Sequence, residues 1–554
     1  MKLFVLLSCG LAAASALEKP PIKQFELDIT WSKRAVDGVD REQVLVNGQF
    51  PGPALIFDEG DDVEVTVNNF LPFNTTVHYH GIVQQGTPWS DGVPGVSQRL
   101  IAPGKQFVHK FNAMQYGTYW YHSHSRGQNM DGLYGPIYIR PRNVDASLLN
   151  TISNDSAARN QMQKAIQDPN LLMLSDWFHN TSEELRQIAL AANLDTICAD
   201  SILINGKGRV RCVDPEYLTS LIPPQISPLL QGKNLTDKGC LSTHNTYAQT
   251  ATPQHYNEIP LPFLTNAKPQ TRQTKRSKSI LKMAGGTRYS VLVQLNNQPG
   301  DYRITAASAG FNQKIAGYGT FSYVNGDPSV VGTSSLNYGG VPSTDAVVLD
   351  GLTVEPLIPD QPTGEPESTY LLTIGRFEKA WKWSLNGDNA YDLSLEKDRP
   401  LLWDPQSQKD SNLVIATKNG TWVDIIFEVA GNKTTLQPGH PIHKHSNMLY
   451  VIGSGLGKFN WTTVAEAKEE IPESFNLVNP PMRDTFTTLP AFQGPSWMAI
   501  RYHVVNPGAF MLHCHIDPHL TGGMMLAILD GIDAWPEIPA HYGPDGHWGK
   551  ATEQ

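Results

Sequence analysis

The sequence predicts an all-β protein built from three related β-sandwich domains, and three observations support this fold class. The chain of 554 residues contains 46 glycines and 40 prolines but only 17% charged residues, which is typical of short strands joined by tight turns. Apolar and polar residues alternate in several short segments. One strand-like motif occurs twice in full and once in weakened form.

Alternation predicts strands along the whole chain. In each segment every second residue is apolar, so one face of the strand turns toward a core and the other toward water. Strands with one solvated face are typical of antiparallel sandwiches. The predicted strands are centred on Val63–Val67, Ile137–Ile139, Val291–Leu295 and Val423–Val429.

The repeated motif divides the chain into domains. Residues 117–124 (GTYWYHSH) align without gaps with residues 508–515 (GAFMLHCH). Residues 300–307 (GDYRITAA) keep the glycine and the aromatic residue but lack both histidines. We therefore expect three similar domains over residues 17–145, 146–340 and 341–554, the middle one without a metal.

Residues 1–16 predict a secretory signal peptide. Lys2 precedes an apolar run that ends in Ala14-Ser15-Ala16, a small-x-small cleavage site. No later apolar run is long enough to span a membrane, so we expect a secreted, extracellular protein with no membrane partner. Seven N-x-Ser/Thr sequons agree with an extracellular glycoprotein. The net charge of −10 argues against a nucleic-acid partner, because a phosphate backbone requires a basic surface.

The four cysteines that follow the signal peptide serve two purposes. Cys514 stands between two histidines. The other three, Cys198, Cys212 and Cys240, can form one disulfide with one thiol left over. The shortest separation along the chain favours Cys198–Cys212.

Ten of the 17 histidines fall into four short clusters. In a strand, residues i and i+2 point to the same face, so each His-x-His pair presents two imidazoles side by side. Four such pairs in one chain predict a metal centre. The clusters are His78-Tyr79-His80, His122-Ser123-His124, His440-Pro441-Ile442-His443-Lys444-His445, and His513-Cys514-His515 followed by His519.

The donor atoms indicate copper. Cys514, His519 and Met524 are spaced as Cys-x4-His-x4-Met, and with His440 they form the His2Cys set with a weak thioether ligand that is typical of blue copper sites. A structural zinc site would be a closed tetrahedral set without this soft ligand. Alternation puts Cys514 on one strand face and its two flanking histidines on the other, so this three-residue segment connects two metal centres.

The other eight histidines, four from each outer domain, are able to enclose a cluster of several ions. Domain one lacks a second blue-copper site, because none of the four ligands is kept there. Its residues at the positions of His440, Cys514, His519 and Met524 are Thr75, Ser123, Gln128 and Leu133. The cluster should therefore lie where domains one and three meet.

These motifs resemble the four copper signatures of multicopper oxidases, in the fungal laccase-like and ascorbate-oxidase-like branch. The segments HPIHKH and HCHIDPHLTGGM carry the likeness most specifically, and it extends over most of the mature chain. The resemblance implies three cupredoxin-like β-sandwiches, with the second acting as a copper-free spacer, and four copper ions per chain. It implies a type 1 copper on His440, Cys514, His519 and axial Met524, a type 2 copper on His78 and His443, and a type 3 pair on His80, His122, His515 and on His124, His445, His513.

The resemblance also implies a reaction and roles in it. Electrons from a donor at the type 1 copper reach the cluster through Cys514, His513 and His515, where O2 is reduced to water. Asp91, in Trp89-Ser90-Asp91-Gly92, resembles the family's proton-relay carboxylate, although a turn aspartate before glycine is an alternative interpretation. An axial Met524 implies a low potential and easily oxidised donors.

Four functions are compatible with these motifs. A laccase-like oxidase of small phenolic or aromatic reductants comes first, because HPIHKHSN and Pro480–Asp484 resemble that fungal subgroup. Ascorbate oxidase is the alternative, because the segment around Met524 resembles it equally well. A ferroxidase would need carboxylates beside the type 1 copper to bind Fe(II). Copper sequestration without catalysis would predict surplus Met-rich or His-rich tracts and no electron path.

Overall fold

The computed structural model is mainly β-structure, with 36% of residues in strands and 14% in helices, which confirms the all-β class. Within the described residues, no helix combines the length and the hydrophobicity needed to cross a bilayer. The predicted signal peptide and the Asn432 sequon lie outside the described residues. The structure describes residues 22–543 except for 145, 196–197, 225–226, 228–231, 241–278, 296–297, 311–312, 324, 333, 350, 357–359, 388, 398, 408–410 and 432–436.

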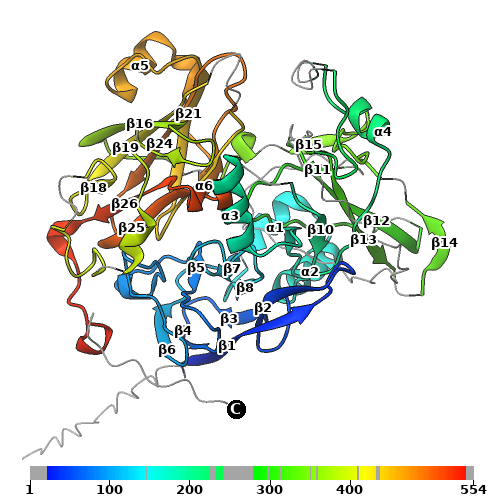
Figure 1. Ribbon diagram of the computed structural model, residues 1–554, viewed down its shortest axis with the longest axis horizontal. Coiled ribbons are helices and arrows are strands. Elements are labelled where there is room, and N and C mark those ends of the chain that lie inside the picture. Colours follow the sequence, from blue (N-terminus) through cyan, green and yellow to red (C-terminus); the bar gives the residue numbers. More distant parts are fainter. Residues whose placement is uncertain are drawn as a thin grey trace, which may run out of the picture.

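Two four-stranded sheets form the N-terminal part, coloured blue to cyan in Figure 1. Their strand orders are β2-β1-β4-β6 and β3-β8-β7-β5. In β4 the residues Val63, Val65 and Val67 are buried and alternate with less buried ones, as predicted. The strands are β1 (Lys23–Arg34), β2 (Arg41–Val46), β3 (Leu55–Asp58), β4 (Asp62–Asn69), β5 (His78–His80), β6 (Gln106–Asn112), β7 (Gly117–His122) and β8 (Tyr134–Arg140).

A six-stranded and a five-stranded sheet form the C-terminal part, coloured yellow-green to red in Figure 1. Their orders are β17-β16-β19-β24-β21-β22 and β18-β26-β25-β20-β23. The predicted strand Val423–Val429 lies within β19. The strands are β16 (Ser368–Arg376), β17 (Trp383–Ser384), β18 (Val414–Ala416), β19 (Trp422–Val429), β20 (Pro441–Lys444), β21 (Leu449–Leu456), β22 (Met482–Arg483), β23 (Thr485–Thr487), β24 (Ser496–His503), β25 (Gly508–Cys514) and β26 (Met525–Asp530).

The N-terminal and C-terminal sheets share one hydrophobic core. Two backbone hydrogen bonds also join them, from Leu401 N to Gly95 O (3.1 Å) and from Leu402 N to Val96 O (2.9 Å). Burying both sheet pairs against each other stabilises the interface at which the histidine motifs of the two parts meet.

The middle part contains only small sheets among its described residues. The weakened third copy of the motif forms β12, as expected for a strand. The predicted strand Val291–Leu295 is wrong: these residues are irregular, and Val293 and Leu295 are 44% and 46% exposed. Alternation alone does not make a strand unless a neighbouring edge pairs with it. The strands are β9 (Leu174–Trp177) with β10 (Ser201–Ile204), β11 (Ser279–Leu281) with β15 (Val347–Leu349), and β12 (Gly300–Ala307) with β13 (Ala316–Ser322) and β14 (Asp327–Val331).

Short helices connect the sheets, and α3 positions a residue of the site. A capping box between Thr181 and Glu184 begins this helix, and Asn193, with a left-handed φ of 53°, ends it. The Asn193 side chain then accepts a hydrogen bond from Ala380 N (2.9 Å), which holds the helix end near β17. The helices are α1 (Ala146–Ile152), α2 (Ser156–Gln167), α3 (Ser182–Ala192), α4 (Pro215–Ser220), α5 (Val464–Glu470) and α6 (Asp517–Thr521).

The disulfide joins Cys198 to Cys240, which corrects the predicted Cys198–Cys212 pairing. Cys212 is exposed and its thiol is free. The Gln313 side chain explains the pairing, because it bonds both backbone groups of Ala199 (3.0 and 2.8 Å) and the carbonyl of Lys238 (3.0 Å). These contacts bring Cys198 and Cys240 together. They link segments that are distant in sequence, so the separation between cysteines along the chain could not predict the pairing.

A buried ion pair is formed by the last residue of β20, which stands between two of the predicted ligands. Lys444, between His443 and His445, donates to Asp530 Oδ2 (2.5 Å), and both side chains are fully buried. Lys444→Met should lower the free energy of unfolding by about 3–5 kcal/mol, because Asp530 is left as an unpaired buried charge. The double variant Lys444→Met/Asp530→Asn should recover part of this loss, because the amide is neutral and its oxygen can still accept from Thr417 and Tyr502. Urea unfolding of both variants checks the prediction, and equal stabilities would contradict it.

Candidate metal centre

Strand pairing arranges the histidines of the two outer parts in the same way. In β5 and β7, His78 lies opposite His122, and in β20 and β25, His443 lies opposite His513. Opposed residues of an antiparallel pair place their side chains on one face. The ring centroids are accordingly 5.4 Å and 5.5 Å apart. Within the four His-x-His pairs the ring centroids are 4.8–6.0 Å apart.

All eight of these histidines come together in one buried group. Rings from opposite ends of the chain stack, His78 on His445 at 3.8 Å and His80 on His443 at 3.7 Å between centroids. His513 Nε2 lies 3.1 Å from His445 Nε2 and 3.3 Å from His124 Nε2. The two histidine sets therefore interleave at the interface of the two sheet pairs.

The hydrogen bonds of the rings leave lone pairs that face one another. His513 Nδ1 donates to the Cys514 carbonyl (2.9 Å), and His445 Nδ1 donates to Asp91 Oδ2 (2.9 Å). We infer that the Nε2 atoms of both rings carry lone pairs, which repel at 3.1 Å unless a cation lies beside them. Four further Nε2 atoms are buried without a hydrogen-bond partner, those of His78, His122, His443 and His515.

Burial also keeps these rings in the neutral form that binds metals. It lowers the pKa of seven of the eight imidazoles, and the neighbouring imidazoles lower the pKa further. A neutral imidazole with an outward lone pair is a metal ligand, so the group fits several cations. The seven are His80, His122, His124, His443, His445, His513 and His515.

The second predicted set lies on the other side of β25. Cys514 Sγ is 3.8 Å from His440 Nδ1 and 3.6 Å from His519 Nδ1. Met524 is fully buried, and its backbone accepts from Cys514 N (3.1 Å) and donates to the His519 carbonyl (2.9 Å). Burial raises the pKa of the Cys514 thiol, so a thiolate there requires an adjacent cation. A soft sulfur between two imidazoles fits copper.

The corresponding place in the N-terminal part is filled by a hydrogen-bonded polar group. Gln128 Oε1 accepts from Thr75 Oγ1 (2.6 Å) and from Ser123 Oγ (3.0 Å). Its Nε2 donates to the Asn74 carbonyl (2.7 Å). The residues that replace His440, Cys514 and His519 thus satisfy one another, as side chains do where no metal is bound.

Asp91 contacts two of the histidines from within a tight turn. Its backbone carbonyl accepts from His78 Nδ1 (2.6 Å), and its carboxylate accepts from His445 Nδ1 (2.9 Å) and from Ser446 Oγ (3.2 Å). Gly92, with φ +88°, has no room for a Cβ, which would lie 1.9 Å from the Val77 carbonyl. Asp91 thus precedes the tight turn at Gly92 and also forms hydrogen bonds with two of the histidines.

Comparisons with known proteins identify the family. Residues 28–144, 168–247 and 376–533 match three family profiles that are each described as multicopper oxidase. The chain is 40% identical to laccase abr2 of Aspergillus fumigatus, over 96% of this chain and 98% of that protein. This chain belongs to the multicopper oxidases. It is also 42% identical to multicopper oxidase MCE of Talaromyces pinophilus, over 94% of this chain and 95% of that protein.

Solved structures share the fold of this multicopper oxidase. The laccase of Botrytis aclada has a TM-score of 0.66 at 23% identity, covering 94% of this chain and 90% of that one. Fet3p, a multicopper oxidase that functions in iron import, has a TM-score of 0.64 at 21% identity, covering 94% of both chains. This likeness confirms the cupredoxin-type fold. Copper is the cofactor of the family, and the donor sets described above fit it.

Three residues beside the set of His440, Cys514 and His519 were not predicted from the sequence. The Asp195 carboxylate lies 3.5 Å from His519 Nε2, accepts from Trp383 Nε1 (2.7 Å) and lies 3.5 Å from Arg376 Nη1. Trp383 stacks on His519 with ring centroids 4.0 Å apart. Burial raises the pKa of Asp195, although Trp383 and Arg376 lower it. These residues are distant from His519 in sequence, so no local pattern links them to it.

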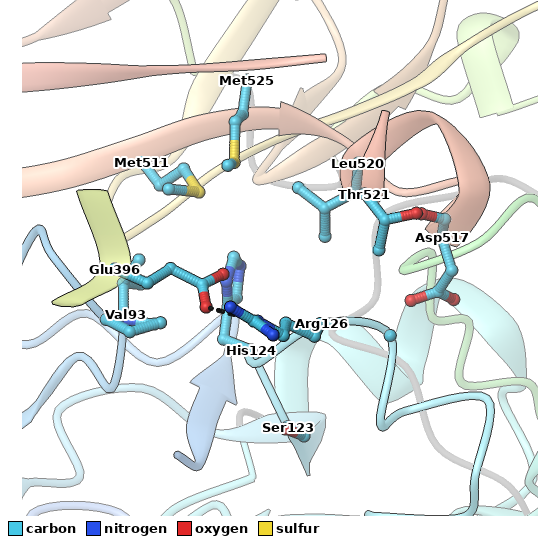
Figure 2. Close-up of a pocket in the computed structure, with 12 residues that line it drawn as sticks. Val93, Ser123, His124, Arg126, Glu396, Met511, Asp517, Leu520, Thr521 and Met525 are labelled. Carbon is cyan, nitrogen blue, oxygen red and sulfur yellow. Dashed lines mark hydrogen bonds and ion pairs between the residues drawn. The ribbon is translucent and has the colours of Figure 1, made fainter. Parts of the chain in front are cut away.

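Figure 2 shows a small cavity beside His124, with room for about one water molecule. Glu396 and Asp517 both line it, and burial raises the pKa of each to about 7. Arg126 Nε lies 3.7 Å from Glu396 Oε2, which accepts no hydrogen bond. Carboxyl groups thus lie near the histidines at two places, Glu396 and Asp517 around the cavity beside His124 and Asp91 bonded to His445.

Proposed function

We propose that this multicopper oxidase removes single electrons from small phenolic or aromatic donors at a type 1 copper and reduces O2 to water at a trinuclear cluster. When bound, the copper ions would take up electrons one at a time and deliver four of them to O2, which with four protons from the protein and solvent yields two waters. One observation carries the proposal: Cys514 of the type 1 set is joined by single peptide bonds to His513 and His515 of the histidine group.

The proposed ligands follow the division into two sets. Close approach of donor atoms, all within 4.8 Å of one another, supports the type 1 set of His440, Cys514 and His519 and the type 3 set of His124, His445 and His513. Met524 completes the type 1 set. The remaining ligands are His78 and His443 for the type 2 copper, and His80, His122 and His515 for the other type 3 ion.

The chain's own groups orient these ligands and supply protons. Backbone carbonyls fix the imidazole tautomers, which raises ligand basicity and sets ring direction. Burial of all eight histidines excludes bulk water, which limits escape of partly reduced oxygen. Asp91, bonded to His445, is the proposed relay for protons consumed in forming water.

The surroundings of His519 support a phenolic donor. One-electron oxidation of a phenol makes its hydroxyl strongly acidic, so the donor must pass a proton as well as an electron. The Asp195 carboxylate, 25% exposed and beside the Nε2 edge of His519, is placed to accept that proton. Trp383 is stacked on His519 and bonded to Asp195, which fixes the direction of both side chains.

Ascorbate is the second candidate donor, because Arg376 lies at the same place. This guanidinium is 27% exposed and carries the charge that an ascorbate anion requires. A ferroxidase site would need carboxylates that bind Fe(II), whereas the Asp195 carboxylate is paired with the guanidinium of Arg376, which repels a cation. We also propose secretion, because residues 1–16 have the pattern of a signal peptide. A secreted protein whose first residue is Leu17 would support this.

O2 uptake by the copper-loaded protein tests the proposed function. 2,6-Dimethoxyphenol, ascorbate and Fe(II) are compared at matched concentrations, with peroxide assayed in parallel. We expect the phenol to be oxidised fastest with four electrons consumed per O2 and no peroxide. Faster turnover of ascorbate or Fe(II) would overturn the donor assignment, and copper bound well beyond four ions per chain without O2 uptake would favour sequestration.

Asp195→Asn should lower kcat/KM for the phenol by roughly 10-fold to 100-fold, the effect of losing a hydrogen bond to a charged acceptor. The asparagine side-chain oxygen can still accept the hydrogen bond from Trp383, so the arrangement of Trp383 and His519 should be unchanged. Ascorbate should not lose rate, because removing a negative charge beside Arg376 favours an anion. Steady-state kinetics of both donors check this, and equal losses for both would point to a general structural effect.

A further inference from the structure

A segment of the middle part lies directly against the histidine group. Adding a Cβ to Gly286 (φ +79°) would place it 2.7 Å from His515 Cδ2 and 2.8 Å from His80 Cε1. A Cβ on Gly285 would lie 2.7 Å from the His515 carbonyl. The turn is closed by Thr287, whose N donates to the Ala284 carbonyl (3.0 Å). Only residues without side chains fit between this turn and the rings.

Arg288, at the end of this segment, binds across to the C-terminal part. Its Nη1 and Nη2 donate to Asp484 Oδ1 (2.7 Å) and Oδ2 (2.5 Å). Nε donates to the Thr118 carbonyl (3.1 Å), and Nη1 also donates to the Gly286 carbonyl (3.0 Å). One side chain thus joins the middle part to β7 and to the residue before β23. A two-pronged Arg–carboxylate pair fixes direction as well as distance.

Asp484 in turn orients two histidines, His80 through the Thr485 hydroxyl and His443 through its own backbone carbonyl. Its carboxylate accepts the hydroxyl proton of Thr485 (Oγ1 to Oδ1, 2.8 Å). Because that proton points to Asp484, the Thr485 oxygen accepts a hydrogen bond from His80 Nε2 (3.0 Å). His80 Nδ1 is then the nitrogen left with a lone pair, and it is buried without a partner. The Asp484 carbonyl accepts from His443 Nδ1 (3.0 Å), which leaves the lone pair of His443 on Nε2.

We propose that residues 284–288 are a positioning element of the trinuclear centre, in which Arg288 holds Asp484 so that His80 and His443 present their ligating nitrogens, while Gly285 and Gly286 close over His80 and His515. This inference rests on the proposed function. It assigns a role in the copper cluster to the middle domain, for which the sequence predicted only a spacer. Arg288 acts through Asp484 and touches neither donor nor O2.

Arg288→Gln tests the proposal. Glutamine cannot donate two parallel bonds, so Asp484 loses its fixed direction. We expect cluster copper affinity to fall by about 10-fold to 100-fold and the type 2 EPR signal to change, while the blue type 1 band is retained. Arg288→Lys keeps the positive charge but not the two parallel donors. Its cluster copper affinity should lie between those of the wild type and Arg288→Gln, and it remains informative if Arg288→Gln does not fold.

Arg501→Gln is the matched control. Arg501 forms a similar two-pronged pair with Asp424, with Nε to Oδ1 at 2.6 Å and Nη2 to Oδ2 at 2.9 Å, within the β19–β24 pair. Its loss should lower thermal stability without altering the type 2 signal. Wild-type cluster affinity and EPR in both Arg288 variants, or equal changes in Arg501→Gln, would overturn the proposal. A wild-type protein that binds no cluster copper would instead overturn the proposed function.

Discussion

Cys514→Ser is expected to reduce oxidation of every organic donor to background and to abolish the blue absorption band. Serine offers a hard hydroxyl that stays protonated in a fully buried site, whereas the blue site requires a thiolate. The substitution also removes the sulfur that starts the shortest covalent path to His513 and His515. The eight cluster histidines do not depend on this sulfur, so much of the cluster copper should remain.

Copper content, the blue band and the type 2 EPR signal of this variant should be measured together with O2 uptake. Cys212→Ser is the natural control, because Cys212 is an exposed free thiol and its loss should change none of the four readouts. Full donor turnover in Cys514→Ser would contradict the electron path. Loss of all copper would show that the two sets are assembled together rather than separately.

The histidine group was accessible from the sequence because its geometry is local. A His-x-His pair in a strand needs only backbone alternation to align two rings, and the repeat at 117–124 and 508–515 showed that two such strands occur. The replacement of His440, Cys514 and His519 by Thr75, Ser123 and Gln128 was also a local comparison. Strand pairing then explains the contacts, since His78 faces His122 and His443 faces His513.

The remaining features depend on contacts between distant segments. Asp195 reaches His519 because α3 ends at Asn193 and is held to Ala380, which no spacing in the sequence encodes. Cys240 meets Cys198 through the Gln313 contacts rather than by proximity in sequence. The alternation at Val291–Leu295 satisfied the strand pattern, yet Arg288 just before it binds Thr118 and Asp484. Tertiary contacts outweighed local preference there.

Asp91→Asn is expected to slow O2 reduction by about 10²-fold to 10⁴-fold, the usual contribution of a positioned acid or base. The Asp91 carboxylate accepts from both His445 Nδ1 (2.9 Å) and Ser446 Oγ (3.2 Å). An asparagine amide has one oxygen for these two donors, and its nitrogen cannot accept. The variant keeps the turn at Gly92 and the backbone carbonyl bonded to His78, so the loss concerns the carboxylate alone.

The two half-reactions separate a proton relay from a purely orienting role. Anaerobic reduction of the blue band by a phenol concerns the proposed type 1 set and should proceed at the wild-type rate in Asp91→Asn, whereas reoxidation by O2 should be slow. If Asp91 only orients His445, cluster copper affinity should fall by about 10-fold to 100-fold, and reoxidation should recover when copper is restored. A relay predicts slow reoxidation with all four coppers bound, because each turnover must still bring four protons to a site that the chain has closed to bulk water.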